Sequence, residues 1–447
     1  MIQTERIRPL NNQTAKSRDF VLYWMQSTQR AEHNHALEYA VDEANERGKP
    51  LLVFFGLTDR YPEANLRHYA FMLEGLREVE CSLGERGIKL VVWPISPEIG
   101  AVKLTRCACL VVVDRGYTRI ERRWRSFVAQ RIDCPLIQVE TNAIIPLEQA
   151  SPKEEFAART IRPKIRKQLA KYLVPLKTRR VRKDSLGLKF DSLSLADVDE
   201  ALAGLSVDRS VGRVSSFVGG TAEARKRLRE FIANKLSAYP EMRNDPNADG
   251  VSHLSPYLHF GQISPLFIAL EVLKAKKRAA DVYLEELIVR RELSLNFVYY
   301  NEHYDDFEGL PQWAKKTLKE HQKDKREPIY SLPELESAQT NDPYWNAAQK
   351  EMVLTGKMHG HMRMYWGKRI IEWARTPEEA FRSALYLNNK YELDGRDANG
   401  FTGVAWCFGK HDRAWPSRPV FGKVRTMKAS GLLRKFDADA YAKKYEV

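Results

Sequence analysis

Five short, continuously apolar segments within the first 140 residues constrain the fold more than any other feature of this sequence. They are separated by longer amphipathic stretches and read F-V-L-Y-W-M (20–25), L-L-V-F-F (51–55), K-L-V-V-W (89–93), C-L-V-V-V (109–113) and L-I-Q-V (136–139). Strands that are apolar at every position are typical of a parallel sheet covered by helices on both faces. The pattern predicts a doubly wound α/β domain over residues 1–143.

The first stretch between two of these strands has a clear helical period. Its apolar face is formed by Ala36, Leu37, Ala40, Val41 and Ala44, and Gly48 ends it before Pro50. In such sheets ligands bind at the carboxyl ends of the strands. The candidate ligand contacts there are residues 25–27, 56–57 and 114–116. No G-x-G-x-x-G sequence follows a strand, which disfavours a dinucleotide bound in the usual Rossmann manner.

Residues 144–220 are expected to form a basic linker interrupted by prolines. The segment 161–183 alternates basic residues with Ile165, Leu169 and Leu173, and two interpretations stay open. It is either a basic surface helix that binds phosphates or a connecting helix that packs its aliphatic face on both domains.

Long helical periods dominate the rest of the chain, and residues 221–447 are predicted to form an all-helical domain. Thr221 resembles the N-cap of its first helix. Further helices are expected at 265–276, 279–300, 313–321, 342–355, 360–374 and 377–389.

Composition narrows the class of partner. The formal net charge is +14 with 29% charged residues, which is compatible with a polyanionic partner but leaves nucleic acid, an acidic membrane surface and no specific partner equally open. The five cysteines lack zinc-type spacing, so reduced thiols and no metal site are expected. Because no apolar run resembles a signal peptide or a membrane span, we expect an intracellular protein, cytoplasmic in a prokaryote.

Three groups of residues are candidates for chemistry. Ser252 and Ser255 lie at a turn leading into a helix, where free N–H groups favour phosphate oxygens, although such caps are common. Glu286 and Arg290 are one helical turn apart and form either a surface ion pair or the wall of a polar cavity.

Tryptophans form the third group. Trp366 and Trp373 share a face of one predicted helix, about 10 Å apart along its axis, and Trp345 lies on the preceding predicted helix. Such indoles either pack as an ordinary core or relay an electron over short gaps between rings.

Several motifs together closely resemble the photolyase and cryptochrome superfamily, and within it the class II cyclobutane pyrimidine dimer photolyases. These motifs are L-S-P-Y-L-H-F-G-Q-I (254–263), E-E-L-I-V-R-R-E-L (285–293), T-G-K-M-H-G-H-M-R-M-Y-W-G-K (355–368), L-N-N-K-Y-E-L-D-G-R-D-A-N-G (387–400) and R-P-V-F-G-K-V-R (418–425). The resemblance covers nearly the whole chain.

The resemblance implies FAD, active as FADH⁻, inside the helical domain. Residues expected at its ribityl and pyrophosphate part are Tyr239, Ser252, His253, Leu254 and Ser255. Those expected at the isoalloxazine and phosphates are Arg290, Arg363, Asp394 and Asp397. Asn388 resembles the class II asparagine near flavin N5, with the adjacent Asn389 as the alternative.

The resemblance also implies light-driven electron transfer to a flipped-out pyrimidine dimer in double-stranded DNA, by a monomeric carbon–carbon lyase. Glu286 would hydrogen-bond the lesion and Trp406 would pack against it. Photoreduction would run from flavin to surface through Trp366, Trp345 and Trp373. The α/β domain resembles those that hold an antenna chromophore, either 8-hydroxy-5-deazaflavin or folate, and an empty pocket stays an alternative.

Two other functions stay open. The first is a cryptochrome-like blue-light receptor without repair activity, which usually carries an output extension, whereas this chain ends soon after the last family motif. The second is a basic nucleic-acid-binding protein without flavin. Glu286 and Trp406 favour a repair enzyme over the receptor, and a yellow or blue colour of the purified protein would exclude the protein without flavin.

Overall fold

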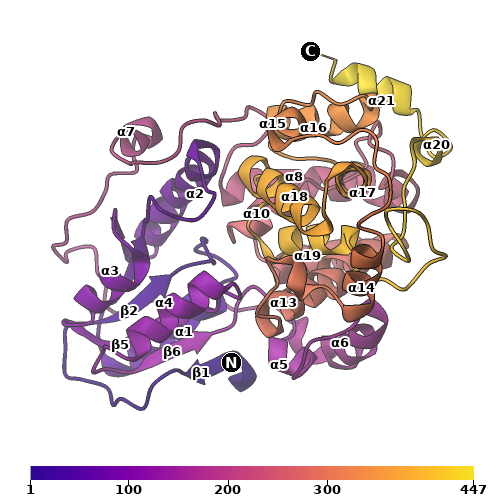
Figure 1. Cartoon of the computed structure of the whole chain (residues 1–447). Helices are drawn as coiled ribbons and strands as arrows, with labels where there is room; N and C mark the ends of the chain where they lie inside the picture. The colour runs from indigo at the N-terminus through magenta and orange to yellow at the C-terminus, as the bar shows by residue number, and fades with distance from the viewer. Residues whose placement is uncertain (1, 447) are drawn as a thin grey trace.

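The computed structural model describes residues 2–446, which form a sheet-containing part and a larger helical part (Figure 1). The sheet has six strands in the order β1-β6-β5-β2-β3-β4. Their bounds are Ile7–Pro9 (β1), Phe20–Met25 (β2), Leu51–Gly56 (β3), Lys89–Trp93 (β4), Ala108–Asp114 (β5) and Leu136–Val139 (β6). The five predicted strands are therefore confirmed to within one residue at each end.

β1 is the strand that the sequence did not predict. It pairs antiparallel with β6, with Ile7 opposite Val139, whereas every other pair in the sheet is parallel. β1 is three residues long, lies at the edge and has no buried residue, so it carries no apolar pattern. The sheet is consequently mixed rather than wholly parallel.

Helices cover both faces of the sheet, as the apolar strands require. Val21, Tyr23 and Met25 of β2 pack toward one helical layer, and the alternate residues of β2 pack toward the other. The first layer contains α1 (His35–Arg47), α2 (Leu66–Glu85) and α7 (Val198–Ala203), and the second contains α3 (Pro97–Leu104) and α4 (Arg119–Ala129). The predicted end of α1 is confirmed, because Gly48 adopts the left-handed conformation there.

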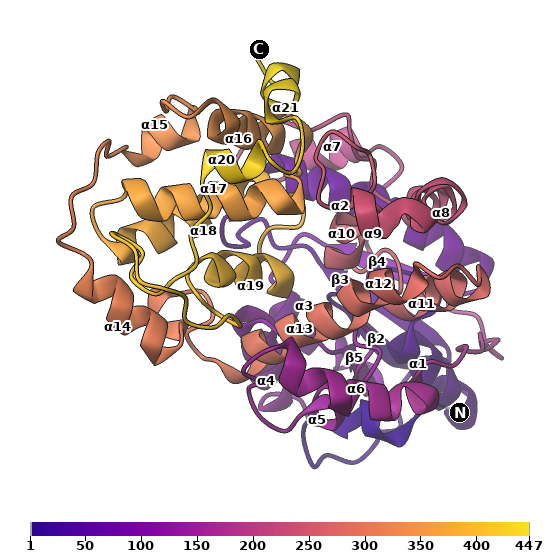
Figure 2. The same ribbon diagram turned by 90° about the vertical axis from the view of Figure 1, so that its right-hand side faces the viewer.

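The remaining helices pack on one another beside the sheet-containing part (Figure 2). Their bounds are Leu147–Ala150 (α5), Ala158–Tyr172 (α6), Thr221–Glu230 (α8), Tyr239–Met242 (α9), Ser255–His259 (α10), Pro265–Lys274 (α11), Ala280–Leu284 (α12), Arg291–Tyr300 (α13), Gln312–Glu320 (α14), Leu332–Glu336 (α15), Pro343–Thr355 (α16), Gly360–Trp373 (α17), Pro377–Tyr391 (α18), Ala398–Cys407 (α19), Ala429–Leu432 (α20) and Ala438–Lys444 (α21). The domain boundaries at residues 143 and 220 stay predictions.

Three local predictions need correction. The N-cap of α8 is Gly220, and Thr221 is its first residue, with its hydroxyl donating to the Gln262 carbonyl at 2.7 Å. The expected helix over 279–300 is divided by a π-helical turn at Glu285–Arg290. The helix within 161–183 ends at Tyr172.

The environment of α6 decides between its two interpretations. Ile161 and Ile165 belong to a buried cluster shared with α8 and α11, which favours the connecting helix. Arg162 pairs with Glu285 at 2.7 Å, so part of its positive charge is neutralised within the protein.

The N-terminal end of α2 joins the two parts of the molecule. The Arg67 guanidinium donates to the carbonyls of Met352, Val353 and Tyr391, at 3.2, 2.6 and 2.7 Å. Burial lowers the pKa of Arg67 to about 10, which leaves it a cation at neutral pH. Each donated bond satisfies a carbonyl at the end of α16 or α18. Helix α2, which packs on the sheet, therefore holds these two helices in place.

The contact between the two parts of the molecule leaves no room for a side chain at Gly261. Its φ is +68°, and a Cβ there would stand 2.0 Å from the Ser27 carbonyl oxygen across the junction. Gly261→Ala should lower the free energy of unfolding by about 2–4 kcal/mol through backbone strain and overpacking, as measured by urea denaturation. Gly204→Ala is the matched control, because the nearest atom to its Cβ lies at 3.7 Å. Equal stability of the two variants would contradict this close contact.

Candidate functional site

A cavity of about 1040 Å³ lies within the helical part, a volume at the upper end of the range for small-molecule and cofactor sites. Most of the predicted site residues line it, although they are spread over 168 positions of sequence. Those in its wall are Tyr239, Ser252, His253, Leu254, Ser255, Glu286, Arg290, Arg363, Asp394, Asp397 and Trp406. Asn388 and the three predicted electron-transfer tryptophans lie outside the lining.

Arg363 is a partly buried cation of this wall. Its Nη2 atom lies 3.0 Å from Glu392 Oε1 and 3.3 Å from Asp394 Oδ1. Burial opposes ionisation of Asp394, yet Arg363 and Lys357 hold its pKa well below the usual range. Burial raises the pKa of Glu392 to about 8 despite Arg363. Asp394 is thus the ionised member of this carboxyl pair at neutral pH.

One end of the cavity is suited to an anion. Ser252 lies in the turn before α10 and Ser255 is the first residue of this helix, where Lys357 Nζ donates to Ser255 Oγ at 2.5 Å. Tyr283 donates its hydroxyl to Ser252 Oγ at 3.2 Å, and Lys235, which pairs with Asp249, also lines the cavity. The two serine hydroxyls and the Lys357 ammonium match the oxygens of a diphosphate.

The mouth of the cavity holds Glu286 and Arg290, on the π-helical turn. These two residues do not pair: Glu286 Oε1 accepts from Arg243 Nη1 at 2.8 Å, and Arg290 Nε lies 3.9 Å from Glu285. In a π turn, residues four positions apart no longer lie directly above one another, so the expected pair of Glu286 and Arg290 does not form. Both residues line the cavity together with the partly buried Trp406, which agrees with the polar-cavity interpretation.

The three tryptophans form a chain of ring contacts. The Trp345 and Trp366 rings are stacked, with centroids 6.2 Å apart and planes 6° from parallel, and Trp345 meets Trp373 edge-on at 5.4 Å. The order Trp366, Trp345, Trp373 is therefore the order in space. α17 starts at the cavity, where Gly360 and Arg363 line it, so Trp366 is the nearer end of the chain.

The predicted outer end of this chain needs a correction. Trp373 is 2% exposed and does not reach the surface. The half-buried Tyr330 packs edge-on against it at 5.1 Å, and the Arg369 guanidinium carbon lies 4.6 Å from its ring centroid. Tyr330 and Arg369 are not among the three predicted tryptophans, and no pattern in the sequence indicates that they contact Trp373.

Other residues of the cavity wall were missed by sequence reasoning. Lys357 stands within the quoted T-G-K motif, so its position was visible although its role was not. Glu392, which stands within the 387–400 motif, does not line the cavity but contacts Arg363 of the wall. His359 stands in the same motif as Lys357, whereas Arg243 lies in no quoted motif and only the tertiary structure brings it to the wall.

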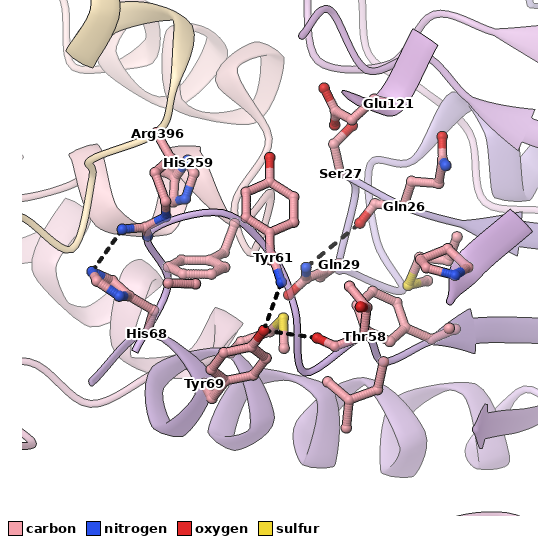
Figure 3. Close-up of a pocket in the computed structure, with 18 of the residues that line it drawn as sticks. Gln26, Ser27, Gln29, Thr58, Tyr61, His68, Tyr69, Glu121, His259 and Arg396 are labelled. Atoms are coloured by element: carbon pink, nitrogen blue, oxygen red, sulfur yellow. Dashed lines mark hydrogen bonds between the residues drawn. The ribbon is translucent and has the colours of Figure 1, made fainter. Parts of the chain in front are cut away.

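A second pocket lies at the carboxyl ends of the strands, between the sheet and the helical part (Figure 3). Of the strand-end candidates, 25–27 and 56–57 line it, but 114–116 do not. His259, Phe260 and Arg396 line it from the helical side. Burial lowers the pKa of Arg396 to about 10, so it presents a cation at neutral pH. Aromatic side chains and one buried cation suit a planar ring system with an acceptor edge.

Within residues 2–446, no three His, Cys, Asp or Glu side chains are grouped so that they would hold a metal ion. The same range contains no helix that is long and apolar enough to cross a membrane.

Comparison with known proteins identifies the family. A family model described as DNA photolyase matches residues 21–181. The chain is 52% identical over 442 residues to the deoxyribodipyrimidine photo-lyase of Methanothermobacter thermautotrophicus, covering 99% of this chain and 98% of that protein. It is 43% identical to the deoxyribodipyrimidine photo-lyase of Arabidopsis thaliana, covering 94% and 88% of the two chains.

Solved structures show the same fold. A class III photolyase from Agrobacterium tumefaciens has a TM-score of 0.74 at 17% identity, covering 97% of this chain and 87% of that one. An archaeal photolyase from Sulfolobus tokodaii, solved with two FAD molecules, has a TM-score of 0.72 at 18% identity, covering 96% and 90%. The fold is thus that of photolyases. By its full-length relatives, the chain belongs to the DNA photolyase family of flavoprotein DNA-repair lyases.

Two histidines of the cavity make stability depend on pH. Burial, and then the charge of Lys357, lowers the pKa of His253 to about 4 and that of His359 to about 3. Below about pH 6.5 the unfolded chain binds protons that the folded chain does not. The free energy of unfolding should therefore fall as the pH drops from about 6.5 to 5.

His359→Asn tests this, because asparagine keeps the cap that His359 Nδ1 provides to the His361 N–H at the start of α17. Between about pH 6.5 and 5 the variant should lose about 2 kcal/mol less stability than the unmodified protein, measured by urea denaturation of flavin-free protein. The exposed His303→Asn is the control. An identical pH dependence in all three proteins would contradict the lowered pKa of His359.

Proposed function

We propose that the protein is a deoxyribodipyrimidine photo-lyase of the class II type, which uses light to split cyclobutane pyrimidine dimers in DNA. The observation that carries the proposal is that one cavity brings together hydroxyl and ammonium groups suited to an anion, a partly buried Arg363–Asp394 pair, and Glu286 with Trp406 at its mouth. The full-length relatives named deoxyribodipyrimidine photo-lyase support it.

The residues present fit FAD, held in the cavity by the charges and donors already described. Ser252, Ser255 and Lys357 would bind the diphosphate, and Arg363 with Asp394 would bind the polar edge of the isoalloxazine. Arg363 Nε and Asn388 Oδ1 are buried without a partner, as expected of groups that a ligand completes. Reduced FAD would supply the electron that light drives onto the lesion.

The mouth of the cavity would receive the flipped-out dimer. Trp406 offers an aromatic face on which a pyrimidine packs, and Glu286 offers a carboxylate to its N–H groups. Arg243 holds that carboxylate in place at 2.8 Å. The net charge of +14 favours contact with DNA phosphates that does not depend on sequence.

Repair of a thymine dimer tests the function. The flavin is reduced chemically, an oligonucleotide carrying the dimer is added, and absorbance of the restored thymines is followed under near-UV or blue light. Recovery above the dark control is expected, and its absence would refute the lyase.

In the same assay, Glu286→Ala should retain flavin and lower the repair yield about tenfold, because a charge-assisted hydrogen bond to the lesion is lost. Glu285→Ala removes the neighbouring carboxylate, which pairs with Arg162 instead, and is the matched control. Full repair by Glu286→Ala would contradict the assignment of this residue.

The tryptophan chain would reduce the oxidised flavin under light and would take no part in repair itself. Trp366→Phe should block photoreduction of the oxidised flavin, because it removes the end of the chain nearest the cavity, and should leave repair by pre-reduced enzyme unchanged. Absorbance of the flavin under illumination measures the first effect. Trp313→Phe, which alters a tryptophan of α14 outside the chain, is the control. Loss of both activities in Trp366→Phe would show another role.

The second pocket is the proposed antenna site, for 8-hydroxy-5-deazaflavin or folate. Ala64 lines it, so Ala64→Trp should fill the pocket and abolish repair driven by light that only the antenna absorbs, while repair driven through the flavin persists. The exposed Ala196→Trp is the control. Enzyme reconstituted with either chromophore provides the action spectrum, and absence of binding by both would refute an antenna at this pocket.

A cryptochrome-like light receptor without repair activity is the alternative function. Fold similarity alone does not separate the two, but Glu286 held by Arg243 at the cavity mouth favours a lesion pocket. We propose that the enzyme acts inside the cell, where its DNA substrate lies, and that it acts as a monomer.

A further inference from the structure

Helix α6 carries a concentration of positive charge that the functions described so far do not use. It contains no acidic residue and six basic ones, which are Arg159, Arg162, Lys164, Arg166, Lys167 and Lys171. Arg162 and Arg166 are four positions apart, and like charges at this spacing destabilise a helix. Surface helices ordinarily mix the two signs of charge. Negative charge from outside the helix is therefore expected to offset this excess.

The protein itself supplies only part of that negative charge. Three of the six cations pair with acidic side chains, namely Arg162 with Glu285, Lys164 with Glu155 and Lys171 with Glu5. The other three are exposed, on the side of α6 opposite its buried residues. We call these three, Arg159, Arg166 and Lys167, the outer face of α6. Within residues 2–446, Arg159 and Lys167 have no acidic partner, and Arg166 reaches only Glu285, at 4.0 Å.

The outer face of α6 lies beside the mouth of the cavity. Glu285, the partner of Arg162, directly precedes Glu286 on the π-helical turn at that mouth. The segment before α6 also reaches the mouth, because Nδ1 of the cavity-lining His411 lies 2.8 Å from the Phe156 carbonyl oxygen. Figure 2 shows α6 on the same side of the molecule as α13 and α19. A long ligand with one part inside the cavity therefore has this face within reach.

We propose that the outer face of α6 binds the phosphate backbone of the duplex on one side of the dimer. The proposal rests on the proposed function and adds to it a surface outside the cavity. Arg159 and Lys167 are eight positions apart, about 12 Å along the helix axis. They span about three or four base-pair steps of a DNA strand. Guanidinium and ammonium groups bind phosphate oxygens in any sequence, so this face holds the duplex but does not recognise the lesion.

The test is the salt dependence of binding to a labelled duplex with about ten base pairs on each side of one thymine dimer, measured by fluorescence anisotropy. Arg159→Gln combined with Lys167→Gln should weaken binding about tenfold at low salt and reduce the slope of log Kd against log salt by about two, because two phosphate contacts are lost. Undamaged duplex should lose the same factor, because backbone contacts carry no information on the lesion. Repair of an isolated dimer dinucleotide, which has no flanking duplex, should be unchanged.

Lys103→Gln combined with Arg106→Gln is the matched control. It removes one lysine and one arginine from exposed positions at the end of α3, in the sheet-containing part (Figure 1), and should leave the slope unchanged. An equal change in both double variants would reflect net charge alone and would overturn the inference. A loss confined to dimer-containing DNA, or to vesicles of phosphatidylserine measured alongside, would overturn it too. If the unmodified protein binds duplex DNA but repairs no dimer, the proposed function fails instead.

Discussion

Arg363, clamped between Glu392 and Asp394, is the interaction on which the rest of the site depends. It joins α17, which carries Trp366 and Trp373, to the segment between α18 and α19. Burying the two opposite charges of Arg363 and Asp394 is expensive, and removal of either one would leave the other uncompensated. The cluster therefore fixes the tryptophan chain of α17 and the wall of the cavity in one geometry. It also presents a cation and an ionised carboxylate, since the pKa of Asp394 is held low.

The sheet-containing part does more than line the second pocket, because it also holds helices of the helical part in place. Arg67 at the start of α2 binds the carbonyls that end α16 and α18, so the sheet fixes the helices around the cavity. Glu63, just before α2, reaches Asn389 from the same loop region. These contacts unite the two parts, because buried backbone carbonyls require donors and α2 supplies them. A deoxyribodipyrimidine photo-lyase built in this way needs both parts for one active site.

The sequence revealed those features that repeat along the chain. Buried strands and amphipathic helices were predictable from apolar periodicity, whereas β1 is too short and exposed to have any. The Glu286 partner was not predictable, because Arg243 lies 43 residues away and a π turn displaces Arg290. Family motifs indicated the members of the cavity wall and the order of the tryptophans. The cover of Trp373 by Tyr330 depends on tertiary packing that no local pattern encodes.

A crystal structure of the protein with FAD bound would test the assignment of the cavity most directly. The flavin is expected in the helical cavity, with its diphosphate at the turn of Ser252 and Ser255 and its isoalloxazine against Arg363 and Asp394. Asn388 Oδ1 should then lie within hydrogen-bonding distance of N5. Electron density for flavin only in the pocket at the strand ends, with the helical cavity filled by water, would contradict the account.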